Sequence, residues 1–398
     1  MHPSVRSSAT FLSVVALLGL SLSACSEDWE GPSPTPATAS LGCEISGSGT
    51  LALAVGSHAN APAPRIDPAL VDLMKQSVKA RHNIVLVRVD GAPEVVFDIP
   101  FTSSAGNDVS LEDDINSYLT AVEQRIKGDV PAKAPEVNVL SALSRAARST
   151  EPGGNVVLID PGLQTTKPLD FREVIDAEPS EVVAHLRKQQ LIPDLTGRKV
   201  LLSGLGDTAS PQPKPDSRLY QNIIAIWKAI AQAGGAACVA IDGKPNDQAA
   251  PTGVPAVSVV PLPSVPDTFT ACSQADLSDG NHVGFLQGRS EFREPAEARK
   301  TLTNLASTIR KDDLRVKLIG NTSSEGSQEH NLRLSKERAN AVKQELIKLG
   351  VSAESITAEG HGEKGQNRID DVAPDGTLLP GPAARNRKVI AQLTCPST

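Results

Sequence analysis

Few side chains of this sequence are suited to catalysis or metal binding, and their spacing does not group them. There are 5 cysteines and 7 histidines, but no CxxC pair and no HExxH motif, the common arrangements of zinc ligands. The serine of Gly47-Ser48-Gly49 lacks the fuller pattern of a nucleophile elbow. We therefore predict no catalytic residue, no metal, no cofactor and no enzymatic activity. The histidines stand singly among polar residues and are expected at the surface: His58, His82, His185, His282, His330 and His361.

Two further patterns could indicate a bound ion or nucleotide, and both have simpler explanations. Asp160 ends an apolar stretch, but one carboxylate is a poor site for a hard cation, and Asp160-Pro161-Gly162 is typical of a turn. Residues 204–209 match the G-x-G-x-x-A of dinucleotide-binding loops. The prolines within 210–215 prevent a helix from starting there, and pyrophosphate binding needs that helix. We expect a structural loop.

Composition narrows the class of protein. The chain has 398 residues, enough for two or three domains, and its 39% hydrophobic and 21% charged residues fit a soluble globular protein. Aromatic residues are only 3%, so aliphatic side chains must fill the core. The net charge of −7 argues against a nucleic-acid partner, which would require a basic face.

The N-terminus has the features of an export signal. Arg6 provides positive charge, and the apolar run 11–22 is too short to span a bilayer of about 30 Å. The run ends in Leu22-Ser23-Ala24-Cys25, which resembles a bacterial lipobox. That resemblance implies a lipoprotein signal peptide at 1–24, an acylated Cys25 that holds the protein to a membrane, and a proline-rich tether at 25–42. The alternative is an ordinary cleaved signal peptide with a chance cysteine.

The other cysteines point to disulfides. An exported chain with four remaining cysteines favours two bonds, and three connectivities are possible. The sequence alone does not choose among them. Our hypothesis pairs Cys43 with Cys238 and Cys272 with Cys395, because each pair then brackets one expected domain.

Residues 43–242 are expected to form one α/β domain. Strands that are apolar on both faces alternate with amphipathic helices, which predicts a largely parallel sheet covered on both sides. The expected strands are 50–55, 83–89, 94–99, 155–159, 199–202 and 237–241, and the expected helices are 67–81, 110–126, 137–148, 180–190 and 217–233. A capping box, Ser110-x-x-Asp113, should open the second helix.

This order of elements resembles the von Willebrand factor A fold. Members of that family often bind a divalent cation through Asp-x-Ser-x-Ser after the first strand. Here the corresponding segment, 56–61, contains no aspartate, and Asp160 alone stands at a family metal position. The resemblance therefore implies the fold without a full metal site.

A second domain should follow a proline-rich linker at 243–281. Residues 282–398 read as β-α-β-α-β-β, with strands at 283–286, 314–319, 355–359 and 388–393 and helices at 295–310 and 329–349. The loop 369–382 carries Asp370, Asp371 and Asp375, which could hold calcium but are more typical of a solvated turn.

This segment resembles the OmpA-like peptidoglycan-binding domain. The likeness is carried by Gly320-Asn321-Thr322-Ser323, by Gly326, and above all by 331–342, which fit N-x-x-L-S-x-x-R-A-x-x-V. Gly360-His361-Gly362-Glu363 and the segment 383–389 complete it. The resemblance implies an α/β sandwich that binds the peptidoglycan stem peptide non-covalently.

The resemblance also implies roles for single residues. Arg338 would bind a carboxylate of the stem peptide, Asn331 would order the loop 320–326, and Asn386 and Arg387 would line the opposite wall. Ser323 stands where the family has an aspartate that holds the ammonium group of diaminopimelate, so wall binding should be weakened. Glu325 is a possible substitute acid, although a solvated loop acid is the commoner case.

These observations predict a lipid-anchored cell-envelope protein that faces the cell wall, in the outer membrane if the cell has two membranes. Its partners would be peptidoglycan, the membrane and a protein bound by residues 43–242. The alternative function makes residues 43–242 a ligand-binding or enzymatic module and the C-terminal domain an anchor only.

Overall fold

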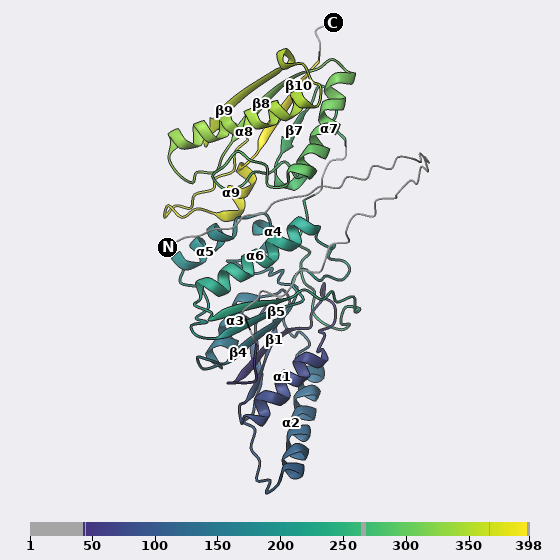
Figure 1. Ribbon diagram of the computed structural model, residues 1–398, viewed down its shortest axis with the longest axis vertical. Coiled ribbons are helices and arrows are strands. Elements are labelled where there is room, and N and C mark those ends of the chain that lie inside the picture. Colours follow the sequence, from purple (N-terminus) through teal and green to yellow (C-terminus); the bar gives the residue numbers. More distant parts are fainter. Residues whose placement is uncertain (1–42, 44, 264–267, 366, 396–398) are drawn as a thin grey trace, which may run out of the picture. The chain divides into compact units, whose positions relative to one another are not determined.

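The computed structural model describes residues 43, 45–263, 268–365 and 367–395 (Figure 1). Every described residue lies in one compact unit, within residues 39–398. Cys25, the expected signal peptide and almost all of the expected tether lie outside the described residues. Within the described ranges, no helix is long and apolar enough to cross a membrane.

The first domain is built on a six-stranded sheet of order β3-β2-β1-β4-β5-β6. Its strands are β1 (Leu51–Gly56), β2 (Ile84–Val89), β3 (Glu94–Asp98), β4 (Asn155–Ile159), β5 (Lys199–Ser203) and β6 (Cys238–Asp242). All neighbours pair in parallel except β2 and β3. The expectation of a largely parallel sheet is confirmed, whereas the likeness to von Willebrand factor A remains a prediction.

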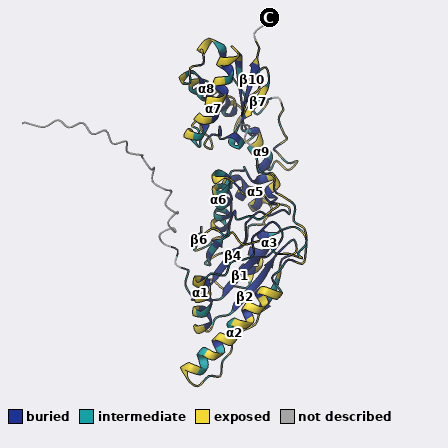
Figure 2. Cartoon of the chain, turned by 90° about the vertical axis from the view of Figure 1, so that its right-hand side faces the viewer, coloured by how far each residue is buried: buried dark blue, intermediate teal, exposed yellow. Residues whose placement is uncertain are grey.

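Helices cover both faces of this sheet, because alternate residues of its buried strands point to opposite sides. The helices are α1 (Pro68–Lys79), α2 (Asp108–Gly128), α3 (Val139–Arg148), α4 (Phe171–Val174), α5 (Pro179–Lys188) and α6 (Ser217–Ala233). Leu51 and Leu53 pack with α1 and α2, whereas Ala52 and Ala54 pack with α3, α5 and α6. Figure 2 shows β1, β2 and β4 as buried and the outer side of α2 as exposed.

The C-terminal domain has a four-stranded sheet of order β7-β10-β8-β9. Its elements are β7 (Gln274–Leu277), α7 (Pro295–Lys311), β8 (Arg315–Asn321), α8 (Gln328–Lys348), β9 (Ile356–Gly362), α9 (Pro380–Asn386) and β10 (Val389–Thr394), with 3-10 turns at Asp279–Asn281 and Ala353–Ser355. Only β8 and β9 pair in parallel. The aliphatic faces of α7 and α8 pack on this sheet, as in an α/β sandwich.

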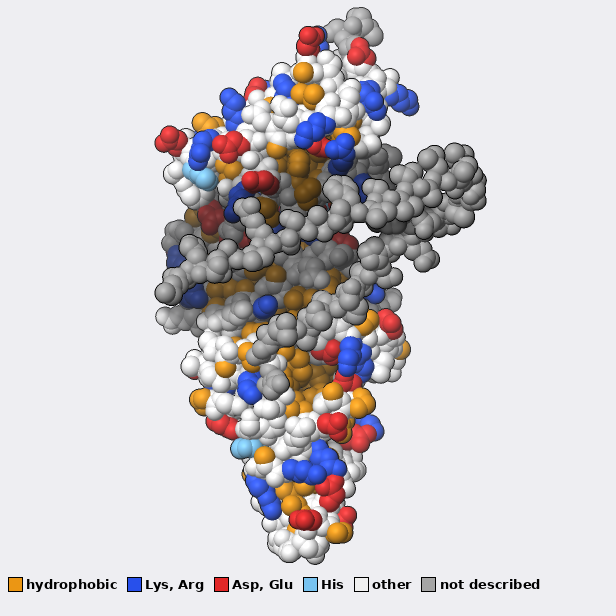
Figure 3. Space-filling view, viewed as in Figure 1, with side chains coloured by type: hydrophobic (Ala, Val, Ile, Leu, Met, Phe, Trp, Pro, Cys, Tyr) orange, Lys and Arg blue, Asp and Glu red, His pale blue; other side chains and the backbone are white. Residues whose placement is uncertain are grey.

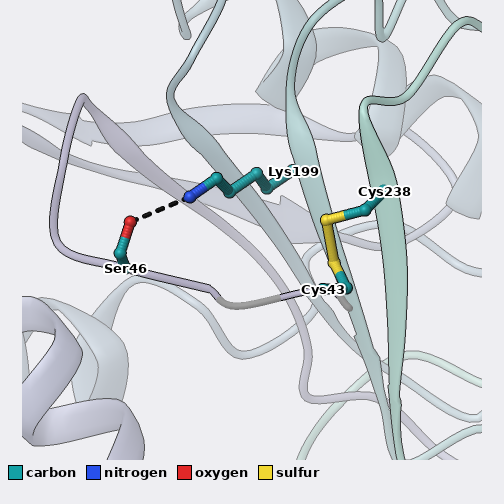
Figure 4. Close-up of a disulfide and its surroundings, with 4 residues drawn as sticks. All are labelled: Cys43, Ser46, Lys199 and Cys238. Carbon is teal, nitrogen blue, oxygen red and sulfur yellow. Dashed lines mark hydrogen bonds between the residues drawn. A yellow bond between two sulfur atoms is a disulfide. The ribbon is translucent and has the colours of Figure 1, made fainter. Parts of the chain in front are cut away.

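Two disulfides connect the ends of these domains. Cys43 bonds to Cys238 with 5.4 Å between their Cα atoms, and Cys272 bonds to Cys395 with 5.2 Å. The structure thus has the hypothesised pairing. Figure 4 shows that the first disulfide fixes the entry segment against β6, next to a 2.9 Å hydrogen bond from Lys199 Nζ to Ser46 Oγ.

The segment 243–281, expected to be a linker, belongs to the two domains instead. Val260 is buried in the core of the first domain, whereas Phe269 is buried in the core of the second. The edge strand β7 also lies in this segment. The prolines there interrupt helices and strands, but they do not prevent the chain from packing.

Two local expectations were wrong. Residues 283–286 form no strand, because only a single bridge joins Phe285 to Phe292, and β7 takes the expected place at the sheet edge. The second helix begins at Asp108 with Asn107 as its N-cap, so the Ser110 capping box is not used.

Candidate functional site

The loop between β8 and α8 is held by very close packing of α8 on the sheet. A Cβ atom at Gly320 would lie 1.9 Å from the carbonyl oxygen of Ser335, and one at Gly360 would lie 2.4 Å from the amide nitrogen of Lys336. Only glycine allows this approach. The two glycines therefore set the position of the α8 residues, including Asn331 and Arg338.

Arg338 is buried, and its guanidinium is held by the segment 285–289. Its Nε donates to the carbonyl oxygen of Arg289 at 2.9 Å, and its Nη2 donates to that of Leu286 at 3.3 Å. The guanidinium lies over the Phe285 ring, 5.2 Å from its centroid. Burial and the nearby charge of Arg387 lower the pKa of Arg338 to about 10, so it stays cationic at neutral pH.

The charge of Arg387 contributes to the lowered pKa of Arg338. Arg387 forms an ion pair with Glu181 of α5. Its neighbour Asn386 is also buried, but its amide makes two hydrogen bonds to the backbone of Ile369, at 2.7 and 3.0 Å. Asn386 therefore shapes the preceding loop.

Asn331 is buried at the start of α8, where its Nδ2 donates to Glu363 Oε2 at 2.8 Å. This bond ties α8 to the turn after β9. The expected ordering of the loop 320–326 comes instead from Asp371, which accepts hydrogen bonds from the Ser324 amide at 2.9 Å and the Ser324 hydroxyl at 2.7 Å. Ser323, beside it, is buried, and Glu325 is exposed.

Asp371 is buried and also pairs with Arg368, so the expected solvated turn is wrong at this position. Burial alone would raise the pKa of Asp371, but the bonds from Ser324 and the charge of Arg368 hold this pKa below its usual value. Asp375 is exposed and accepts from the amide of Thr377 at 2.9 Å.

Sequence reasoning missed three residues that contact the predicted site: Phe285, Asp371 and Glu181. Glu181 lies far from the C-terminal domain in sequence, and no local pattern links it to Arg387. Asp371 was noticed as one of several acids, and only its burial distinguishes it. Among the described residues, no three His, Cys, Asp or Glu side chains gather as metal ligands would.

The first domain has a buried polar pair at the carboxyl ends of β1 and β4. His58 Nε2 lies 2.9 Å from Asp160 Oδ2, and the side chains are 4% and 0% exposed. The expected surface location of His58 is therefore wrong. The expected turn at Asp160 is confirmed, because its Oδ1 accepts from the Gly162 amide at 2.7 Å. After Gly204 and Gly206, no helix begins before Ser217.

On the face of the C-terminal domain seen in Figure 3, basic and acidic side chains are intermingled. They do not form a single basic patch on this face.

Comparison with known proteins identifies the C-terminal domain. The profile of the OmpA family matches residues 284–376. Outer membrane protein A of Bordetella avium is 30% identical over 139 residues, which are 35% of this chain and 67% of that protein. Photosystem I P700 chlorophyll a apoprotein A2 of Gloeobacter violaceus is 40% identical over 74 residues, 19% of this chain and only 8% of that protein.

Solved structures similar to this chain include the peptidoglycan-associated lipoprotein from Burkholderia pseudomallei. It is 23% identical, with 28% of this chain and 85% of that chain covered and a TM-score of 0.22. The cell wall anchor of the T6SS from Pseudomonas aeruginosa is 21% identical, with 31% and 81% covered and a TM-score of 0.25. By the family match and the Bordetella relative, this chain belongs to the OmpA family through its C-terminal domain.

Proposed function

We propose that the C-terminal domain binds peptidoglycan non-covalently and thereby attaches this protein to the cell wall. The observation that carries the proposal is the buried cationic side chain of Arg338, within the residues 284–376 that match the OmpA family. A guanidinium presents a planar set of N–H donors that matches a carboxylate, and such charge-assisted bonds are stronger than neutral ones. The carboxylates of a stem peptide are the ligand groups that such a guanidinium fits.

Ser323 makes binding weaker than an aspartate would at that position. A hydrogen bond to a charged group contributes about 1.5–3 kcal/mol, so its loss corresponds to a roughly ten- to a hundredfold weaker complex. Glu325 is exposed two residues away and supplies the nearest substitute carboxylate on the same loop.

The protein acts in the cell envelope, with acylated Cys25 as its membrane anchor and the outer membrane as its location in cells with two membranes. The lipobox-like sequence supports this part of the proposal. Cys25→Ala should leave an unprocessed or mislocalised precursor, and mass spectrometry of the mature chain should find acylation at Cys25. An unmodified N-terminus at another residue would contradict the anchor.

The first domain presents a surface to another partner in this account and is not an enzyme. Ligands of parallel α/β sheets usually bind at the carboxyl ends of strands where the strand order reverses, which here is between β1 and β4. The segment 257–260 covers nearby loops: Asn60 Nδ2 donates to the carbonyl oxygen of Val257 at 2.9 Å, and Gln212 Oε1 accepts from the Val260 amide at 2.7 Å. The chain itself therefore packs over this edge.

Co-sedimentation of the full chain with purified sacculi tests the proposal. Arg338→Ala should abolish sedimentation, and Ser323→Asp should increase it about tenfold or more because it restores a charged partner. Arg333→Ala is the matched control, since Arg333 lies on the same helix with its side chain 67% exposed. If only Ser323→Asp sediments, the natural domain has lost wall binding and the proposal fails.

A further inference from the structure

The first domain contacts Arg387, a residue predicted to line the stem-peptide site. Glu181 of α5 pairs with Arg387, and the two side chains are 3% and 13% exposed. Glu178, at the N-cap of α5, pairs with Arg293 of the C-terminal domain. Both Glu178 and Arg293 are close enough to affect the pKa of Arg338. Two carboxylates of the first domain thus face the basic side chains around Arg338.

The short helix α9 is held by the first domain as well. A Cβ atom at Gly381 would lie 2.2 Å from the carbonyl oxygen of Glu173, so the two backbones are in direct contact. Arg385 Nη1 donates to the same carbonyl oxygen at 3.3 Å. Because α9 leads directly into Arg387, this contact places Arg387 against α5.

The contact is mainly polar. Further bonds join Lys188 Nζ to the carbonyl oxygen of Asp375 at 3.0 Å and Ser180 Oγ to Gln287 Oε1 at 3.3 Å. A cavity of about 450 Å³ remains beside Glu181 and is lined also by Ser324 and Glu325. Polar, incompletely packed contacts between domains are typical of interfaces that open and close.

We propose that the first domain is an intramolecular competitor of peptidoglycan, with the Glu181 carboxylate occupying the position of a stem-peptide carboxylate on Arg387. This inference rests on the proposed function and adds its regulation. In the closed arrangement the Arg387 side chain is paired with α5 and only 13% exposed, so wall binding requires the domains to separate. The apparent affinity of the full chain is then the affinity of the open form multiplied by the fraction of open molecules.

Two substitutions on opposite sides of the contact test this inference in the full chain. Gly381→Leu places a side chain where the backbone of Glu173 lies. Glu181→Lys places a lysine ammonium group next to the Arg387 guanidinium, so the ion pair becomes a repulsion. Each should increase binding to sacculi at least tenfold and increase the radius of gyration measured by X-ray scattering. Adding Arg338→Ala should abolish the gained binding.

The matched controls are Gly106→Leu, where an added Cβ meets nothing within 4 Å, and Glu123→Lys on the exposed surface of α2. Both control variants should have the same binding to sacculi and the same radius of gyration as the natural chain. If the natural chain already binds as well as the opened variants, and Arg338→Ala still abolishes binding, the competition is refuted while wall binding stands. If no chain binds, including the opened variants, wall binding is refuted and the competition with it.

Discussion

His58 has hydrogen-bond acceptors on both sides of its ring. Nε2 lies 2.9 Å from the Asp160 carboxylate, and Nδ1 lies 2.7 Å from the carbonyl oxygen of Ala59. Neither neighbour can donate, so both ring nitrogens carry a proton when both bonds form. Burial alone would lower the pKa of His58, but the charge and hydrogen bond of Asp160 outweigh burial, and the pKa is raised.

Because of the His58–Asp160 pair, we expect the first domain to lose stability as the pH rises. A raised pKa in the folded state adds stability that is fully present below the unfolded value of about 6.5 and is lost as the pH passes the folded value. The free energy of unfolding by urea should therefore fall as the pH rises above about 6.5. Asp160→Asn should remove this pH dependence and lower stability by about 3–5 kcal/mol, because it leaves a buried group without its partner. An unchanged pH profile in Asp160→Asn would contradict the account.

Because the pKa of Glu181 is raised, we expect the contact between the domains to depend on pH. Burial raises the pKa of Glu181 to about 7; Arg387 opposes this shift, while Glu325 adds to it. On α5, His185 and Lys188 line the same cavity. Burial outweighs the pairing of the ionised carboxylate with Arg387, so the closed form binds a proton at Glu181 more tightly than the open form, and closure weakens as the pH rises through about 7. Binding of the full chain to sacculi should increase from pH 6 to 8, whereas Gly381→Leu should show a smaller increase; equal increases would refute this role of Glu181.

At the scale of elements, α8 depends on two glycines beneath it. Gly320→Ala would place a methyl group 1.9 Å from the carbonyl oxygen of Ser335, so α8 must move. Forcing extra volume into a packed contact costs about 1–3 kcal/mol. We expect a loss of that size in chemical unfolding of the C-terminal domain, together with weaker wall binding because Asn331 and Arg338 move with α8. Gly106→Ala should cost little, and equal stability of the two variants would contradict this packing.

Elements with a strong local signal could be predicted from the sequence. The helix at 217–233 has the expected bounds because its apolar residues recur at helical spacing and Asp216 caps its first turn. The strand at 155–159 is also as expected, since it is apolar after Asn155 and is preceded by glycine. In these elements, local preference and tertiary packing agree.

Other features depend on contacts between distant segments. The strand β7 has polar residues at its exposed positions and is defined mainly by its pairing with β10, so its sequence carried little signal. His58 stands among small and polar residues, and its burial follows from Asp160, which is 102 residues away. The pairing of Arg387 with Glu181 spans 206 residues. The motif around Arg338 could thus be found in the sequence, but the first-domain side of the site could not.

At the scale of the whole molecule, each domain is closed by a disulfide that joins residues 195 and 123 positions apart. In the chain-entropy model such loops contribute on the order of 4–5 kcal/mol, although measured values are often lower. Cys272→Ser with Cys395→Ser should lower the melting temperature of the C-terminal domain and leave the pH dependence of the first domain unchanged. No change in melting temperature would mean that this bond adds nothing to folded stability.

The central claim is that Arg338 in the C-terminal domain binds a stem-peptide carboxylate. The most direct measurement is calorimetric titration of the full-length Gly381→Leu chain with a soluble muropeptide that contains diaminopimelate, with and without Arg338→Ala. The account predicts saturable binding that weakens at least tenfold on Arg338→Ala, while Arg333→Ala leaves it unchanged. Equal affinity of the Arg338→Ala and Arg333→Ala chains, or no binding by any of them, would contradict it.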